Sequence, residues 1–343
     1  MRKAIDLFAG CGGLSEGLKH ASFQLIHAVE ILETARSTYK LNHSSTTVDT
    51  DIRMVNADEL LHKHALLPGE LDLLAACPPC QGFSAIRTKN QKAADDERND
   101  LIFEVSRLAS TLLPKAILIE NVPQIIHDYR FDKFVNILKK KGYAVNYGVL
   151  DAQNFSVPQR RKRMILIACR LGNIPIPQDS RRKITVREAI GKLPPSDSDH
   201  HIRLHNMRQQ LSAIVQQRIN LIKKNRCELP RELVLKCHIK YSSGFKDVYG
   251  RMSWDDVSPT ITRSSHNPSK GRFIHPSENR GLTLFEALLL QGFPPHFRFP
   301  ENIGIGKIAS MIGEAVPPPM AQAQAEHIHK YLDFFEQEKG ASL

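Results

Sequence analysis

Short apolar runs alternate with helix-length segments along the first 170 residues of the chain. Runs typical of β-strands cover residues 3–8, 23–29, 71–76, 116–119, 143–150 and 163–169. Between them, Leu101–Leu113 and Phe131–Lys140 carry apolar residues at helical spacing. Because strands and helices alternate, the pattern predicts an α/β fold with a doubly wound, mostly parallel sheet.

This alternation ends near residue 170, where a stretch rich in Pro, Ser and His begins. Helical patterns return only at residues 282–290 and 320–335. The change in composition indicates a domain boundary. We therefore expect a first domain over 1–178, a smaller irregular domain over 179–279, and a segment over 280–343 whose final helix returns to the first domain.

The sequence excludes a membrane protein and argues against a secreted one. Hydrophobic residues make up 41% of the chain, yet no apolar run approaches the roughly 18 to 20 residues that a membrane span needs. The apolar stretch at the start is too short for a secretion signal and is interrupted by Asp6. Six cysteines among 343 residues fit a reducing compartment better than a disulfide framework.

Positive charge is concentrated in one stretch. The chain has 47 Lys and Arg against 36 Asp and Glu, a net charge of +11. Residues 181–280 alone contain 20 basic and 9 acidic residues, also +11, so the remainder balances at 27 against 27. A neutral scaffold with one basic stretch is typical of a protein that binds an acidic polymer. A solvated charged surface is the alternative interpretation.

A glycine-rich turn follows the first predicted strand, at the sheet edge where α/β proteins bind ligands. Residues 6–13 read DLFAGCGG, and Glu30 stands at the end of the second strand. Glycines permit close approach of the backbone, and an acid about 20 residues on suits a ribose diol. A dinucleotide site has similar features, but the last glycine of its GxGxxG spacing is absent. Asp58 is a candidate to follow a third strand and accept from an exocyclic amine, or an ordinary loop aspartate.

The strand at 71–76 runs into Cys77-Pro78-Pro79-Cys80. Two cysteines at this spacing could indicate a metal or redox site, but no second pair follows and the other cysteines are poorly spaced for zinc. We therefore expect no metal. Cys80, on a rigid turn at a strand end, is well placed as a nucleophile. Cys77 fits a packing role.

Two further strand ends carry ionisable residues. Glu120 follows four apolar residues, so partial burial would raise its pKa and make it a candidate proton donor. The run QRRKR, residues 159–163, precedes the last strand of the series. Its guanidinium groups would hold a carbonyl oxygen or a phosphate beside the same crevice, unless they form an ordinary cationic surface.

Taken together, these motifs resemble those of the DNA (cytosine-5)-methyltransferases, especially the bacterial restriction-modification type. DLFAGCGG, PPCQGFS, ENV and QRRKR stand in that family's order and spacing, and RGLTLFEALLLQGFP and GEAVPP match its two C-terminal motifs. Only residues 181–275 lack shared motifs, and in this family that segment is the variable target recognition domain. The resemblance implies a Rossmann-like, S-adenosylmethionine-dependent domain that methylates C5 of cytosine in double-stranded DNA.

The resemblance also implies a covalent mechanism. Cys80 would add to C6 of a cytosine flipped out of the duplex, which makes C5 nucleophilic toward the methyl donor. Glu120 would donate to N3 of the ring, and Arg163 would hold O2. Arg161 would support the catalytic loop.

Ligand-binding residues are implied by the same match. Those implied for S-adenosylmethionine are Phe8, Gly10, Gly12, Gly13, Glu30, Asp58, Pro79 and Leu101. Those implied for DNA are Gln81, Ser84, Arg87, Arg98 and Gln159. One position departs from the pattern, because Glu314 stands where the family usually has asparagine.

Three other functions stay open. Relatives with these motifs methylate transfer RNA, but they usually contain a Cys-Phe-Thr insertion that this sequence lacks. A non-catalytic DNA-binding protein would not need Cys80, Glu120 and Arg163. A nicotinamide enzyme would have no use for PPCQ or QRRKR.

The chain length, without a regulatory extension, is typical of the bacterial type. We therefore expect a monomer in the prokaryotic cytoplasm. A restriction endonuclease would act on the same DNA sequence without binding the enzyme stably.

Overall fold

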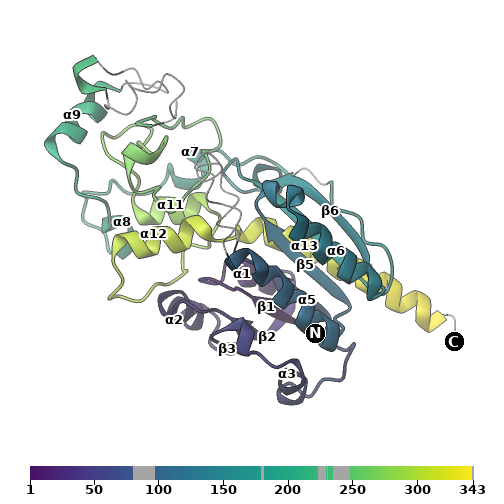
Figure 1. The fold of residues 1–343 in the computed structure, drawn as a ribbon. Coiled ribbons are helices and arrows are strands. Elements are labelled where there is room, and N and C mark those ends of the chain that lie inside the picture. Colours follow the sequence, from purple (N-terminus) through teal and green to yellow (C-terminus); the bar gives the residue numbers. More distant parts are fainter. Residues whose placement is uncertain (80–96, 179–180, 223–228, 230, 235–247, 342–343) are drawn as a thin grey trace. The chain divides into compact units, whose positions relative to one another are not determined.

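The computed structural model describes residues 1–79, 97–178, 181–222, 229, 231–234 and 248–341 (Figure 1). The chain divides into two compact units. Unit 1 comprises residues 1–155, 162–180 and 316–343, and unit 2 comprises residues 156–161 and 181–315. In the described part of the chain, no helix is long and apolar enough to cross a bilayer.

Unit 1 is built on a seven-stranded sheet with the order β3-β2-β1-β4-β5-β7-β6. The strands are β1 (Arg2–Leu7), β2 (Phe23–Val29), β3 (Thr47–Asp49), β4 (Leu73–Ala76), β5 (Ala116–Asn121), β6 (Ala144–Asp151) and β7 (Lys162–Cys169). β1 to β5 pair in parallel, whereas β7 is antiparallel to β5 and β6. The predicted α/β fold with a mostly parallel sheet is confirmed, and the predicted strands lie within two residues of those observed.

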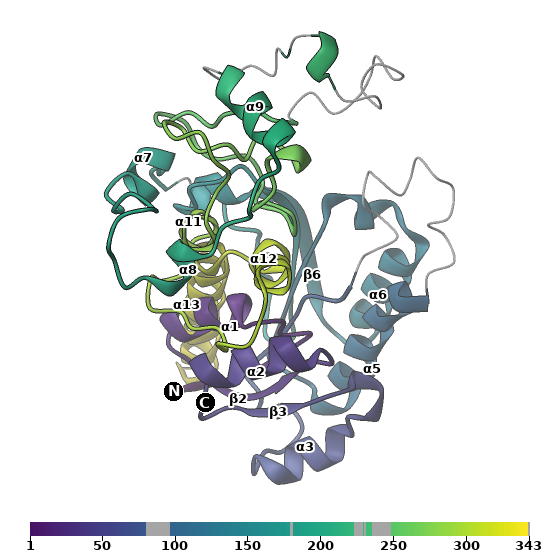
Figure 2. The same cartoon turned by 90° about the vertical axis from the view of Figure 1, so that its left-hand side faces the viewer.

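Helices cover both faces of this sheet (Figure 2). On one face, α3 (Ala57–Lys63), α5 (Ile102–Leu112) and α6 (Tyr129–Lys140) bury their apolar side chains in a core shared with the strands. On the other face, α1 (Gly13–His20) contacts α13 (Pro318–Ala341). α2 (Glu33–Asn42) contributes Tyr39 to a smaller cluster with Ala9 and Ala28.

α1 and α13 approach closely at one glycine. A Cβ atom at Gly17 would overlap the Cβ of Ala321 and would lie 2.6 Å from the carbonyl oxygen of Pro318. At the far end of α13, Glu336 is ion-paired with Arg2 at 2.9 Å and with Lys115 at 2.6 Å. The last helix is therefore packed along unit 1 at both ends.

Unit 2 has a different construction. Its helices are α7 (Val186–Ile190), α8 (Arg203–Asn206), α9 (Ala213–Leu221), α11 (Leu284–Leu290) and α12 (Ile305–Glu314). Its described residues form isolated β-bridges instead of strands. The packing of unit 2 extends to residue 315, whereas the assignment of residues 179–279 to target recognition stays a prediction.

Arginine side chains connect the loops of unit 2. Arg251, 5% exposed, donates to the carbonyls of Ile222, His275 and Glu278 and to the side chain of Asn279, at 2.6–2.9 Å. Arg203 donates to three consecutive carbonyls at residues 299–301, each at 3.0 Å. These guanidinium groups satisfy loop carbonyls that no neighbouring strand satisfies.

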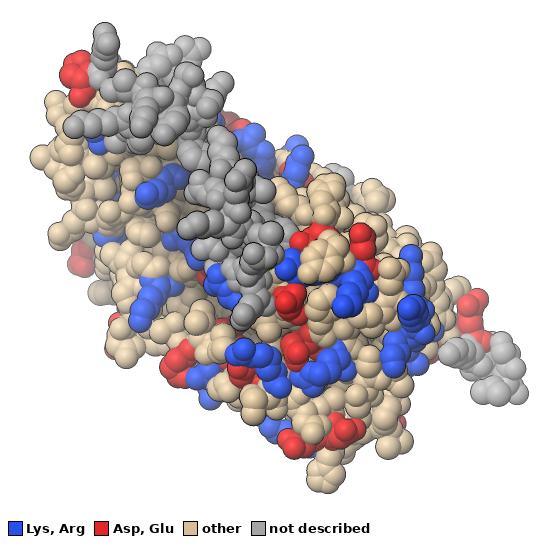
Figure 3. All heavy atoms as spheres, viewed as in Figure 1, with Lys and Arg blue, Asp and Glu red and all other residues tan. Residues whose placement is uncertain are grey.

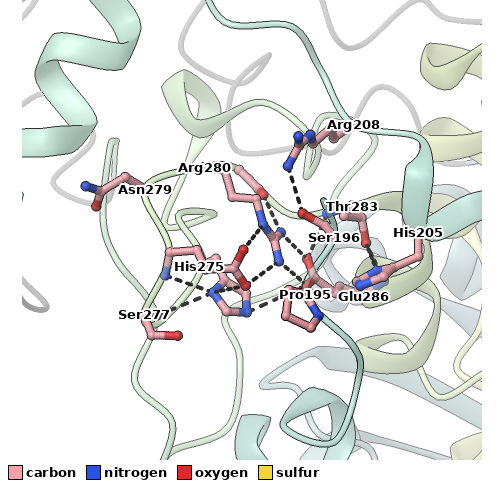
Figure 4. A network of polar contacts seen from close by, with 12 residues as sticks. Pro195, Ser196, His205, Arg208, His275, Ser277, Asn279, Arg280, Thr283 and Glu286 are labelled. Atoms are coloured by element: carbon pink, nitrogen blue, oxygen red, sulfur yellow. Dashed lines mark hydrogen bonds and ion pairs between the residues drawn. The ribbon is translucent and has the colours of Figure 1, made fainter. Parts of the chain in front are cut away.

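A second buried network lies at the start of α11 (Figure 4). Thr283 and Glu286 form a capping box, and Arg280 binds the Glu286 carboxylate with two hydrogen bonds of 2.7 and 2.8 Å. His275 lies 3.6 Å from Glu286, and burial lowers the pKa of His275 to about 4. The N–H of Glu278 donates to His275 Nδ1 at 3.1 Å, which fits a neutral imidazole.

Candidate active site

Glu120 and Arg163 meet at one edge of the sheet of unit 1. Glu120 is near the carboxyl end of β5, and Arg163 is near the start of β7, which runs antiparallel to β5. Arg163 Nε lies 2.8 Å from Glu120 Oε1, with side-chain exposures of 16% and 10%. The structure therefore brings together two residues that are separated by more than 40 positions.

The segment that leads to Cys80 begins beside this pair. β4 is the neighbour of β5, and it is followed by Pro78 and Pro79. Asn121 Nδ2 donates to the carbonyl oxygen of Pro78 at 3.1 Å, and Asn121 is 2% exposed. In the sequence, Asn121 was identified only as part of the ENV motif. In the structure, its side-chain amide ties the segment after β4 to the end of β5.

Four predicted site residues lie outside the described residues. They are Cys80, Gln81, Ser84 and Arg87. Their roles stay predictions. Pro79 is described and half-buried, Arg98 is exposed at the start of the segment before α5, and Leu101 packs against the core of unit 1.

The turn after β1 is held by Glu30. Gly10 N–H donates to Glu30 Oε2, and Leu32 N–H donates to Glu30 Oε1, both at 2.8 Å. Phe8 has a φ of 61° and Gly10 a φ of 57°. A left-handed backbone at a phenylalanine is strained, and such strain concentrates at functional sites. The glycine-rich turn and Glu30, which the sequence predicts to bind the same ligand, are therefore joined by a hydrogen bond.

A buried polar chain supports this turn. Ser15 Oγ donates to Asp6 Oδ2 at 2.6 Å, and Ser15 Oγ lies 2.8 Å from the hydroxyl of Tyr39. Burial raises the pKa of Asp6 to about 7, and the charge of Glu30 acts in the same direction. In the sequence, Asp6 was singled out only because it interrupts the first apolar stretch, and its buried contacts were not predicted.

Gly12 and Gly13 complete the turn at the start of α1. Gly12 has a φ of 105°, and a Cβ there would lie 2.6 Å from His43 Nε2. Gly12 therefore serves both the left-handed conformation and the close packing of the turn on His43. Gly13 is buried as the first residue of α1.

The position of Asp58 differs from its prediction. The third strand ends at Asp49, and Asp58 lies later, exposed in the first turn of α3. Asp58 is therefore neither at the end of a strand nor in a loop, and the three-residue β3 has no long apolar run that would reveal where the third strand ends. Asp51 follows β3 instead, and Glu30 N–H donates to the Asp49 carbonyl at 3.0 Å.

An exposed apolar residue adjoins the same edge. Ile31 directly follows Glu30 and is 60% exposed. An exposed isoleucine beside this acid offers an apolar wall for a flat ring. The signal available in the sequence was the pair Ile31 and Leu32 after the acid, at the end of a strand.

Two residues of the QRRKR run are buried in unit 2. Gln159 is 0% exposed and Arg161 is 3% exposed. The side chain of Gln159 makes its hydrogen bonds to other residues of unit 2. The expectation that Gln159 contacts DNA does not agree with this burial, because no side-chain atom is presented to a ligand. Arg161 donates to the carbonyls of three residues, Ile261, Gly313 and Ala315.

Glu314 is engaged within unit 2. Its carboxylate lies 3.3 Å from Arg263 Nη1 and accepts a hydrogen bond from Ser310 Oγ at 3.2 Å. Both members of the Arg263 pair are about half exposed, at 58% and 47%. In the described residues, no group of three or more His, Cys, Asp or Glu is arranged to hold a metal ion.

The surface charge differs between the two units (Figure 3). On the face shown, Lys and Arg are interspersed with Asp and Glu over the region of α5 and α6 in unit 1. The part of this face formed by unit 2 carries Lys and Arg with few acidic neighbours. This distribution agrees with the basic excess counted along residues 181–280.

Unit 1 is an α/β domain in which the glycine-rich turn follows β1 and the Glu120–Arg163 pair lies beside the exit of the neighbouring strand β4. The family model of the C-5 cytosine-specific DNA methylases matches residues 2–330. The chain therefore belongs to the C-5 cytosine-specific DNA methylases, and it is a DNA (cytosine-5)-methyltransferase.

Two bacterial proteins show similarity over nearly the whole chain. The Type II methylase M.HgiDII of Herpetosiphon aurantiacus is 33% identical over 96% of this chain and 95% of its own length. The Type II methyltransferase M1.BsuMI of Bacillus subtilis is 33% identical over 94% of this chain and 79% of its own length.

Solved structures share the fold. A presumed DNA modification methyltransferase encoded within an E. coli prophage superposes with a TM-score of 0.75 at 24% identity, over 97% of this chain and 100% of the other. The Dnmt2 methyltransferase of S. pombe gives a TM-score of 0.63 at 18% identity, over 96% and 99% of the two chains.

Proposed function

We propose that this enzyme transfers a methyl group from S-adenosylmethionine to a cytosine within one short sequence of double-stranded DNA, as the modification enzyme of a restriction-modification system. The observation that carries the proposal is the Glu120–Arg163 pair beside the exit of β4 toward Cys80. The two Type II relatives support the biological context.

The residues at the turn of unit 1 fit the donor. Glu30 would bind the ribose hydroxyls, Phe8 and Ile31 would contact the faces of the adenine, and the Gly10–Gly13 turn would admit the methionine part. Asp51 replaces Asp58 in our proposal as the acceptor for the adenine amine, because it lies two residues after β3, whose last residue, Asp49, accepts a hydrogen bond from Glu30 N–H. The donor supplies an electrophilic methyl group on a sulfonium.

The chain's own groups would activate the cytosine. The Cys80 thiolate forms a bond to C6, and the electron pair displaced from the ring collects toward N3. Glu120 supplies a proton or hydrogen bond at N3, and Arg163 donates to O2. C5 would then form a bond to the methyl carbon while the methyl–sulfur bond breaks, and the donor would leave as a neutral thioether. Loss of the C5 hydrogen to a base and departure of the Cys80 thiolate restore the aromatic ring.

The Glu120–Arg163 ion pair bears on this step. Because Arg163 Nε lies 2.8 Å from Glu120 Oε1, the two side chains that would contact N3 and O2 of the cytosine are held next to each other.

Exchange of Cys80 tests the nucleophile. Cys80→Ser should retain donor binding, measured by calorimetry, and should lose methyl transfer to DNA. Glu120→Gln should also retain donor binding while slowing transfer by about 10²–10⁴-fold, the usual contribution of a general acid. Methyl transfer by Cys80→Ser at the wild-type rate would contradict the covalent mechanism.

The two Type II relatives support a bacterial setting. We infer that the enzyme acts as a monomer in the bacterial cytoplasm, and that a restriction endonuclease recognises the same sequence without a stable complex. Size-exclusion chromatography with light scattering, with and without a DNA duplex, measures the number of enzyme copies. Two copies on one site would contradict the monomer.

A further inference from the structure

Four segments of unit 2 converge on one buried polar cluster. We name the cluster of Gln159, Arg161 and Gln291 the Gln–Arg node. The three side chains are 0%, 3% and 0% exposed. Gln159 Nε2 donates to Gln291 Oε1 at 2.7 Å, so the two amides form a direct pair.

The node binds both sides of one residue's backbone in the segment 258–261. Ile261 N–H donates to Gln159 Oε1 at 2.7 Å, and Arg161 Nη1 donates to the Ile261 carbonyl at 3.0 Å. The backbone extends this pairing, since Arg160 N–H donates to the Ser258 carbonyl at 2.9 Å. Segment 158–161 is therefore fixed to the segment 258–261 with little freedom in register.

The node also binds the segment 313–315. Gln291 Nε2 donates to the Ala315 carbonyl at 2.6 Å, and Arg161 Nη2 donates to the same carbonyl at 3.2 Å. Gly313 makes this arrangement possible, because a Cβ there would overlap the backbone of Thr262. The contact between the two segments is thus main chain to main chain.

Chain connectivity gives the node its significance. The chain leaves unit 2 for unit 1 after Arg161 and again after Ala315. Arg163, which pairs with Glu120, is only two residues beyond Arg161. A displacement of Arg161 would therefore also displace Arg163.

We propose that Gln291 is a positioning residue for methyl transfer, and that the Gln–Arg node fixes the chain where it enters β7. The proposal rests on the role assigned above to Arg163. Gln291 touches neither substrate nor donor. It acts by holding Gln159 and the Ala315 carbonyl, and through them the two points where the chain enters unit 1.

The main test is Gln291→Leu, which preserves bulk but removes both hydrogen bonds. The single-turnover rate at saturating DNA and donor should fall by about tenfold to a hundredfold, the order expected when a reacting group is misplaced by about 1 Å. Donor affinity should stay within about twofold, because the donor site is in unit 1. Solvent exchange of the cytosine C5 hydrogen without donor, which needs Cys80, Glu120 and Arg163 but no methyl donor, should slow in parallel.

Gln324→Leu is the matched control. Gln324 is 1% exposed in α13, and its amide makes no hydrogen bond to any described residue. The single-turnover rate of Gln324→Leu should equal that of the wild type. A Gln291→Leu rate, corrected for the folded fraction, within twofold of the wild type would overturn the proposal.

Gln291→Glu covers the case in which the leucine variant unfolds. The carboxylate can accept from Gln159 Nε2, but only the protonated acid can also donate to the Ala315 carbonyl. Its rate relative to the wild type should rise as the pH is lowered, and a constant ratio would contradict the proposal. An inactive wild type would refute the proposed function itself, whereas active variants would refute only this inference.

Discussion

The two units of this enzyme solve the same problem, the satisfaction of backbone carbonyls, by different means. In unit 1, the strands of the sheet supply partners for one another along its seven members. In unit 2, whose described residues form only isolated bridges, Arg203 and Arg251 each bind several loop carbonyls. Irregular backbone is thus stabilised by side chains that carry a positive charge.

The internal use of arginine in unit 2 changes how the positive charge of residues 181–280 is interpreted. Residues 181–280 contain 20 Lys and Arg, but Arg251 and Arg280 are 5% and 8% exposed and are bound internally. These arginines cannot serve as phosphate contacts without unfolding their loops. A local excess of positive charge therefore overstates the surface available to DNA.

The largest effect should follow loss of Arg251. Arg251→Met leaves four acceptors without their donor, two of them in fully buried hydrogen bonds, so the free energy of unfolding should fall by about 3–5 kcal/mol. Urea titration followed by the fluorescence of Trp254, the one tryptophan of the chain, reports on unit 2. The exposed Lys270→Met is the control and should change the free energy by less than about 0.5 kcal/mol. Equal losses in both variants would remove the distinction between internal and surface cations.

Unit 1 should be most sensitive to helix packing. Gly17→Val introduces side-chain atoms where α1 meets Ala321 of α13, and overpacking of this kind costs about 1–3 kcal/mol. Thermal unfolding followed by circular dichroism measures the loss. Gly306→Ala in α12 is the control, since a Cβ at this position would have no neighbouring atom within 4 Å. A melting temperature of Gly17→Val at or above the wild-type value would contradict the close packing.

The two units should respond oppositely to pH. The pKa of Asp6 rises from 3.8 to about 7 on folding, so its contribution to stability is present at low pH and is lost as the pH rises through 7. The pKa of His275 falls from 6.5 to about 4, so stability is lost as the pH falls from 6.5 toward 4. Relative to the wild type, Asp6→Asn should gain stability with rising pH over this range, and His275→Gln should lose it. Urea midpoints at several pH values measure both trends, and profiles parallel to the wild type would exclude these two groups.

The smallest effect should follow Glu314→Asn, which restores the residue usual in the family. The pair with Arg263 is about half exposed, so its loss should cost less than about 1 kcal/mol. Because the carboxylate is bound by Arg263 and Ser310, we expect the dissociation constant for the donor to change by less than about twofold. A several-fold change in a calorimetric titration would instead assign Glu314 to the donor site.

Much of unit 1 could be predicted from the sequence because its strands are apolar runs that end in polar residues. Glu30, Glu120 and Arg163 were found in this way, and the structure joins the last two in an ion pair. β3 was not predicted, because its three residues, Thr47–Asp49, are too few to carry a recognisable pattern. Without β3, Asp58 was the acid chosen from the sequence, whereas our proposal assigns the adenine amine to Asp51.

The construction of unit 2 could not be predicted in this way. The partners of Gln159 are Ile261 and Gln291, which are more than 100 residues away, and no local pattern reveals such pairs. The burial of Arg251 is equally hidden, because its partners are mostly backbone carbonyls with no sequence signal. Tertiary contacts, and not local composition, decide which polar residues of unit 2 face the solvent.

The most direct test of the central claim is base-resolution sequencing of 5-methylcytosine in a bacterial host that lacks this modification, after expression of the enzyme. The account predicts methylation at C5 of one cytosine within a single short recurring sequence, and none in the Cys80→Ser strain. A genome without 5-methylcytosine, from cells that contain folded enzyme able to bind S-adenosylmethionine, would contradict it.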